Sequence, residues 1–84
     1  MDYKVLVKVY VPEIEQDFEM YVPINKTVSQ VLILLNKLIN NITNEVYPIK
    51  QYIRLYNRRT FQVYNMETAI RDTDIRNGSE IVIE

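Results

Sequence analysis

The sequence contains no cysteine and no histidine, and it has only one glycine among its 84 residues. The absence of cysteine rules out disulfides, thiolate metal ligands and thiol nucleophiles, so a packed core must supply the stability. Without histidine, neither a Ser-His-Asp nor a Cys-His catalytic arrangement can be built. A single glycine is too few for a glycine-rich phosphate loop. We therefore expect a non-enzymatic protein that needs no cofactor.

Long apolar runs and an excess of charge are missing as well. The longest apolar run is the five residues 31–35, whereas a membrane-spanning helix needs about 20, and no secretory signal pattern opens the chain. Ten basic and eleven acidic residues give a net charge of −1, so no overall field concentrates nucleic acid. We expect one cytoplasmic domain over residues 1–84, with no membrane insertion and no nucleic acid as its main partner.

Two stretches near the start alternate between apolar and polar side chains. In the stretch from Tyr3 to Val11 every second residue is a valine, which predicts a strand with one buried face. Pro12 interrupts the pattern, because it has no amide proton for a sheet, and the alternation resumes from Phe18 to Pro23. These two stretches predict an antiparallel hairpin.

A helical period follows, from Thr27 to about Ile42. Thr27 and Gln30 match a capping box, in which each side chain accepts a bond from a backbone amide of the first turn. The apolar residues recur at steps of three and four, which predicts one core-facing stripe. The stripe comprises Val28, Val31, Leu32, Leu35, Leu38, Ile39 and Ile42, and the residues expected to face water are Ser29, Asn36, Lys37 and Asn40.

The remaining sequence predicts further strands joined by turns. We expect a third strand at Tyr52–Tyr56 and a short fourth strand at Phe61–Tyr64, separated by a polar turn. Residues 72–75 predict one tight helical turn, and Asn77 with Gly78 suits a turn that requires positive φ. A last strand is expected at Glu80–Glu84.

This order of elements resembles the ubiquitin-like β-grasp fold over essentially the whole chain. The resemblance is carried by Val5 and Val7, Phe18, Met20 and Val22, the helix start at Thr27 and Val28 with Val31 and Leu35, the run 51–55, and the ending Ala69-Ile70 through Ile75, Gly78, Ser79, Ile81 and Ile83. It implies an α+β fold with a mixed four- to five-stranded sheet packed on one main helix. Within the superfamily the chain looks most like the YukD/EsaB group, small proteins linked to type VII secretion in Gram-positive bacteria. That likeness implies a cytoplasmic accessory role with secretion-system proteins as partners.

Two departures from ubiquitin bear on function. The sequence stops at Ile83 and Glu84 instead of a flexible diglycine, so we expect no conjugation through the C-terminus. Arg54 occupies the place of an aliphatic recognition residue of ubiquitin, so contacts with ubiquitin receptors should not transfer. Two alternatives stay open: a carrier or modifier matured at its C-terminus, and an auxiliary domain excised from a larger membrane secretion protein.

The β-grasp order implies that the first, last and third strands lie side by side and share an outer face. This predicts a partner-binding surface that combines aliphatic, aromatic and cationic groups, as interface hot spots do. Its predicted residues are Lys4, Leu6, Lys8, Tyr52, Arg54, Tyr56 and Val82. The competing interpretation is that strands favour tyrosine and that cations keep such a face soluble.

Three further features have weaker functional interpretations. Ile33 and Leu34 lie on the flank of the helix and suit a homodimer or a partner helix, unless residues 58–68 cover them. Asp72 and Asp74 suggest a cation site, although carboxylates beside a tight turn more often cap it, and we expect no metal. A weak nucleic-acid role through Lys4, Lys8, Arg54, Arg58 and Arg59 is the last alternative.

Overall fold

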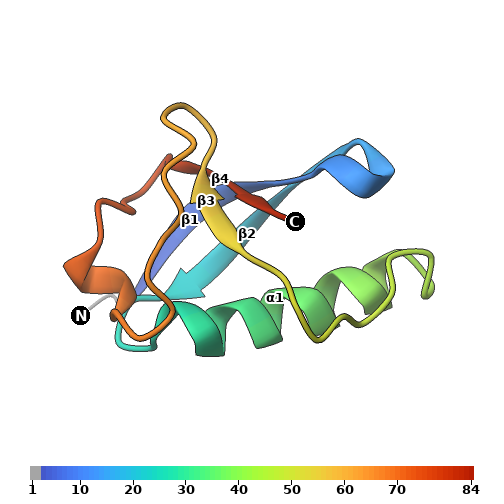
Figure 1. The fold of residues 1–84 in the computed structure, drawn as a ribbon, viewed down its shortest axis with the longest axis horizontal. Helices are drawn as coiled ribbons and strands as arrows, with labels where there is room; N and C mark the ends of the chain where they lie inside the picture. Colours follow the sequence, from blue (N-terminus) through green and yellow to red (C-terminus); the bar gives the residue numbers. More distant parts are fainter. Residues whose placement is uncertain (1–2) are drawn as a thin grey trace.

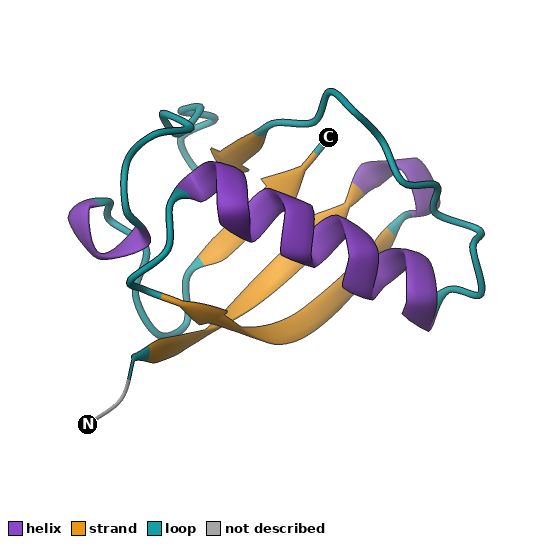
Figure 2. Cartoon of the chain, turned by 90° about the horizontal axis from the view of Figure 1, so that it is seen from below, coloured by secondary structure: helices purple, strands orange, loops and turns teal. Residues whose placement is uncertain are grey.

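The computed structural model describes residues 3–84, which form one mixed sheet and one α-helix. The elements are β1 (Lys4–Val11), the 3-10 turn η1 (Pro12–Ile14), β2 (Gln16–Pro23), α1 (Val28–Ile42), β3 (Leu55–Asn57), the 3-10 turn η2 (Ile70–Asp72) and β4 (Glu80–Ile83). The strand order is β2-β1-β4-β3, with β1 antiparallel to β2 and parallel to β4. α1 lies across one face of this sheet (Figures 1 and 2). The predicted α+β architecture is thus confirmed, with four strands.

The hairpin of β1 and β2 forms as predicted, with Val5 opposite Val22 and Val9 opposite Phe18. Pro12 starts η1, and Glu15 closes the connection with a φ of 52°. A left-handed backbone is unfavourable for a residue with a Cβ atom, so this turn holds some strain. The valines of β1 from Val7 onward are buried against α1 and form the centre of the core.

α1 begins where the sequence predicts. Thr27 Oγ1 accepts a bond from the Gln30 amide at 3.2 Å, and Gln30 Oε1 accepts one from the Thr27 amide at 3.0 Å. The predicted stripe is too wide, however, because Leu38 and Ile42 are exposed. A single helix on a sheet buries only the residues nearest the sheet, and these two lie toward one flank. No described helix is long and apolar enough to cross a membrane.

Asn36 is the clearest misplacement in the predicted helix, since it was expected in water and is only 3% exposed. Its side-chain amide donates to the carbonyl of Pro48 at 3.0 Å and accepts from the amide of Lys50 at 2.8 Å. One turn further, Asn40 donates to the carbonyl of Tyr47 at 2.8 Å. The two asparagines hold the segment after α1 against the helix, and Tyr47 is buried completely there.

The third and fourth strands differ from the prediction. β3 starts at Leu55, so Tyr52 lies outside it, and the predicted strand at 61–64 is reduced to one bridge between Tyr56 and Val63. The Asn57 side chain explains the difference, because it accepts bonds from the amides of residues 59 and 60 and so makes a tight turn. Phe61 leaves this turn with a φ of 62°, which a regular strand does not allow.

The last connection also differs in detail. The 3-10 turn η2 precedes the predicted turn at 72–75 and ends where Thr73 Oγ1 donates to the carbonyl of Ile70 at 2.6 Å. Gly78 adopts a φ of 88°, as expected for a residue chosen for a left-handed turn. Its amide donates to the carbonyl of Leu6 at 2.8 Å. This bond places the start of β4 beside β1.

Candidate protein-interaction surface

The face of the sheet that points away from α1 carries the predicted binding surface. The registers place Tyr10 beside Val82 and Val82 beside Tyr56, so three neighbouring strands contribute one row of apolar side chains. Val82 was predicted to be an exposed contact residue, and this is wrong, because only 2% of it is exposed. Because α1 lies on the opposite face of the sheet (Figures 1 and 2), Val82 is covered by side chains of the outer face itself.

Arg58 reaches over Tyr10, the neighbour of Val82 on β1. Its guanidinium carbon lies 4.3 Å from the centre of the Tyr10 ring, and its Nη1 lies 2.8 Å from Asp17 and 3.4 Å from Glu80. These contacts join β2, β1 and β4 to the residue that follows β3. Since a guanidinium over an aromatic ring gains energy while it keeps its ion pairs, Arg58 acts as a clasp over this part of the face.

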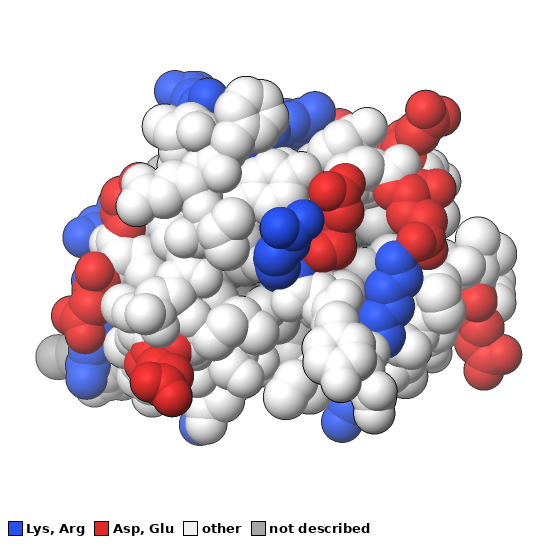
Figure 3. All heavy atoms as spheres, in the orientation of Figure 1, with Lys and Arg blue, Asp and Glu red and all other residues white. Residues whose placement is uncertain are grey.

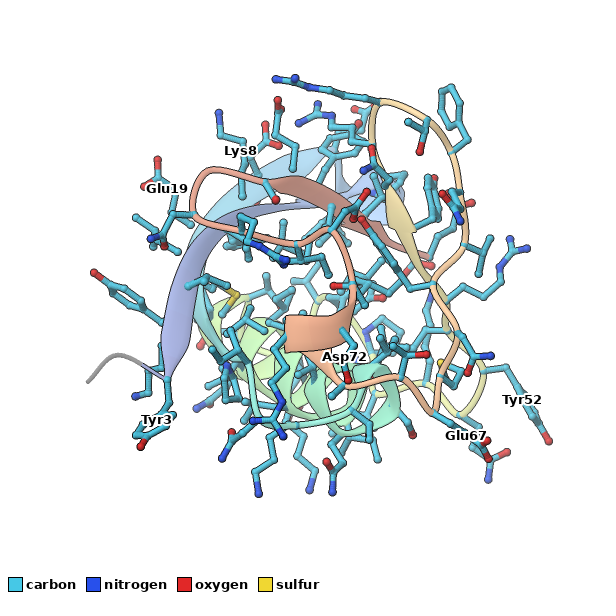
Figure 4. All side chains as sticks on the ribbon, turned by 90° about the vertical axis from the view of Figure 1, so that its left-hand side faces the viewer. Tyr3, Lys8, Glu19, Tyr52, Glu67 and Asp72 are labelled. Carbon is cyan, nitrogen blue, oxygen red and sulfur yellow. The ribbon has the colours of Figure 1, made fainter. Side chains whose placement is uncertain are left out.

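The other half of the outer face stays open. Lys4 and Lys8 are exposed, Leu6 between them is half-buried, and the register places Tyr21 beside Leu6 and Glu19 beside Lys8. A shallow hollow of about 210 Å³ is lined here by Leu6, Val7, Lys8, Glu19, Gly78 and Glu80. Figure 4 shows Lys8 and Glu19 on the same side of the molecule. The structure therefore brings together the predicted residues Lys4, Leu6 and Lys8.

Arg54 and Tyr56 belong to the same face, on its far side, which is the side of β3. Arg54 exchanges two backbone bonds with Glu84, at 2.9 and 3.1 Å, which extends the pairing of β3 with β4 by one residue. Alternation along the strand puts its side chain on the face of Tyr56. Burial, followed by the charge of Glu84, raises the pKa of Tyr56. The clasp of Arg58 lies between this pair and the open half.

Tyr52 does not join the surface. It is 91% exposed, precedes β3 and points away from Lys8 in Figure 4. The prediction put Tyr52 on the outer face because it extended the alternation of β3 too far toward the N-terminus. The pattern holds only from Ile53 onward, because the preceding segment is bound to α1 instead of the sheet.

Charges of both signs are interspersed on the molecule, and Figure 3 shows acidic and basic groups side by side among neutral atoms on the face it presents. Asp74, considered as a cation ligand, accepts a bond from the Tyr64 hydroxyl at 2.6 Å. Burial, with this hydrogen bond as the second cause, raises the pKa of Tyr64 to about 12. Asp74 thus ties the segment after β3 to the turn that follows η2.

Comparison with known proteins identifies the class of fold. No family model and no curated protein sequence matches the chain. Solved structures do match, and several of them are ubiquitin-like domains, so the chain has a ubiquitin-like β-grasp fold.

Among these structures, two relate to type VII secretion. The chain is similar to the EccD5 ubiquitin-like domain of Mycobacterium xenopi, with a TM-score of 0.81 and 9% identity over 99% of this chain and 94% of that one. It is also similar to a chain of the ESX-5 inner membrane complex, with a TM-score of 0.83 and 18% identity. This match spans 99% of the present chain but only 21% of the other chain. A ubiquitin-like domain from Arabidopsis thaliana gives a TM-score of 0.65 and 26% identity, over 99% of this chain and 78% of that one.

Proposed function

We propose that the chain is a non-catalytic, ubiquitin-like interaction module of the bacterial cytoplasm that serves type VII secretion, as members of the YukD/EsaB group do. The observation that carries this proposal is the likeness to the EccD5 domain over almost the full length of both chains. Two properties of the sequence support a binding role over a catalytic one. It contains neither histidine nor cysteine, and these are the side chains most used for acid–base and thiol chemistry near neutral pH.

The surface proposed to bind the partner is the outer face, with Lys8 on its open half and Arg54 on its far side. Both side chains are exposed, and neither takes part in an ion pair within residues 3–84. Cations without an internal partner are the ones whose reversal alters association with little effect on folding. Leu6 and Tyr56 supply apolar area between and beside them.

The double variant Lys8→Glu and Arg54→Glu tests this surface. It should weaken co-purification with the membrane components of the secretion apparatus, while thermal unfolding stays within a few degrees of the wild type. A matched control reverses Lys37 and Arg71, which are exposed on α1 and η2, and changes the net charge equally. Retention of the partner by the first variant, or equal loss in both, would show that the outer face is not the binding surface.

A second candidate is an auxiliary domain of a larger membrane secretion protein. It is favoured by the ESX-5 chain, of which the matched part is 21%. Immunoblotting of the native protein distinguishes the two, because a free-standing module runs near 10.1 kDa and a domain of a larger protein runs far above that mass. Intact mass after incubation with lysate tests the carrier alternative, which requires a covalent adduct.

A further inference from the structure

The outer edge of β2 and the adjacent flank of α1 form a second surface that the proposed function does not use. β2 is one of the two edge strands of the sheet. The amide of Ile24 donates to the carbonyl of Tyr3 at 2.7 Å, and antiparallel pairs alternate between bonded and non-bonded positions. The backbone groups of Asp17, Glu19 and Tyr21 therefore point away from β1, toward the open edge.

An apolar ridge runs beside this edge. Leu34, Leu38 and Ile42 follow one another at four-residue steps along α1 and are 40%, 37% and 57% exposed. At the C-terminal end of α1 the ridge meets a hollow of about 240 Å³, which is lined by Ile14, Gln16, Ile42, Thr43, Asn44 and Val46. Phe18 and Met20 of β2 are only partly buried on the same side of the sheet. The edge thus offers backbone bonds and apolar contacts together.

The opposite flank of α1 is covered by other segments of the chain, so only the flank beside β2 is free to accept a partner. There the segment 47–50 is bound by Asn36 and Asn40, and the carbonyls of Met66 and Thr68 accept the amides of Ser29 and Val28 at 2.9 Å. In Figure 2 the connecting loop passes along that side of the helix, and no segment passes along the side of β2.

The charges at the open edge favour a basic partner strand over a second copy of the chain. Glu15, Asp17 and Glu19 belong to the edge or its start, and Glu45 lies between two residues that line the hollow. Of these four, only Asp17 takes part in an ion pair within the described chain. A second copy pairing antiparallel through β2 would set these acids against one another, which is unfavourable. An incoming strand with basic side chains on the outer face removes that repulsion.

We propose that β2 accepts an extended segment of a partner protein as a fifth strand, with aliphatic and basic residues in alternation. The aliphatic side chains pack on Leu34, Leu38 and Met20, and the basic ones lie beside Asp17 and Glu19. Backbone pairing provides affinity in such complexes, and the alternate side chains provide specificity. This inference deepens the proposed function, since it rests on the chain being a protein-binding module.

Synthetic peptides test the inference without knowledge of the native partner. Each capped peptide has as many residues as β2: one alternates valine and lysine, one alternates valine and glutamate, and one has the composition of the first with its lysines grouped together. The ¹⁵N-labelled chain is titrated with each at low and high salt. The alternating basic peptide should shift resonances of β2, Leu34, Leu38 and Ile42, slow amide exchange at Asp17, Glu19 and Tyr21, and bind more weakly in high salt.

The acidic peptide should bind at least about tenfold more weakly, because two facing positions change from attraction to repulsion. The decisive variant is Asp17→Lys with Glu19→Lys, which should reverse this preference, whereas Lys26→Glu, outside β2, should leave it unchanged. Circular dichroism confirms that each variant folds.

Several results would overturn the inference: equal binding of the basic and acidic peptides, equal binding of the grouped peptide, resonance shifts that map elsewhere, self-association through β2, or no binding up to about 1 mM. In the last case the acids only protect an edge strand from pairing. None of these results bears on the outer face, and failed co-purification with secretion components would in turn leave peptide binding intact. The two proposals therefore fail separately.

Discussion

Replacing Tyr47 with phenylalanine should stabilise the protein, although it removes a polar group from a tyrosine. Tyr47 is completely buried, and its hydroxyl has no hydrogen-bond partner among residues 3–84. A buried polar group left without a partner costs about 1–3 kcal/mol. The ring keeps its packing in the variant, and it also keeps the Lys50 ammonium 5.1 Å from its centre, because that attraction depends on the ring and not on the hydroxyl.

Against this gain stands the small void that the hydroxyl leaves, which costs less than about 1 kcal/mol. The expected net change is a gain of about 1 kcal/mol, or roughly 4–8 °C in the midpoint of thermal unfolding for a domain of this size. Urea and thermal denaturation followed by circular dichroism measure it. Burial raises the pKa of Tyr47, so the comparison should be made near neutral pH, where the hydroxyl is protonated in both states.

The matched control is Tyr64→Phe. Its hydroxyl donates to Asp74 at 2.6 Å and accepts from Asn57 at 3.3 Å, so the same chemical change should cost about 1.5–3 kcal/mol there, since one acceptor is charged. A Tyr47→Phe variant that loses more than about 1 kcal/mol would refute the reasoning. It would mean that the buried hydroxyl is satisfied in solution.

Two further predictions concern the buried polar groups. Because the pKa of Tyr64 rises from 10.0 to about 12 on folding, its contribution is fully present below about pH 10 and is lost as the pH rises through 12. The loss is about 3 kcal/mol, since one pKa unit corresponds to about 1.4 kcal/mol. Urea titrations at increasing pH should show this fall in the wild type and a shallower one in Tyr64→Phe, and parallel curves would contradict the assignment. Asn36→Ala should cost about 2–3 kcal/mol, because the amide of Lys50 and the carbonyl of Pro48 lose their partner. Amide exchange at Lys50 should accelerate, while Asn41→Ala, an exposed change on the same helix, should affect neither quantity.

The regular parts of the fold could be predicted because local chemistry decides them. Alternating valines define β1, and the capping box at Thr27 defines the start of α1. The burial of Asn36 could also have been predicted from the sequence. It lies four residues after Leu32 and three before Ile39, and both are buried, so its position on the helix already faced the packed side. A polar residue at such a position predicts a backbone partner, which here is the segment 48–50.

The surface could not be predicted to the same degree. Val82 alternates correctly to the outer face, yet it is buried there beside Tyr10, over which Arg58 reaches to Asp17 from a place 24 positions before Val82. Such cover by a long side chain leaves no periodic pattern in the sequence. The prediction for Tyr52 was wrong for a related reason, because attachment of residues 48–50 to α1 decides where β3 starts.

The two flanks of α1 show why an open edge persists on this fold. A helix about 10–12 Å wide lies on four strands spaced about 4.8 Å apart, so one helix covers the middle of the sheet and leaves both margins. Toward β3, asparagine side chains bind the connecting chain and close the margin. Toward β2, Leu34 and Leu38 take the equivalent places on the other flank. Leucine has no group that can bind a passing backbone, so it holds no strap, and the margin stays apolar. An apolar margin beside unpaired backbone invites self-association. The acids of β2 oppose pairing between like copies but not pairing with a basic strand, so the charge that keeps this edge soluble also defines the partner it can accept.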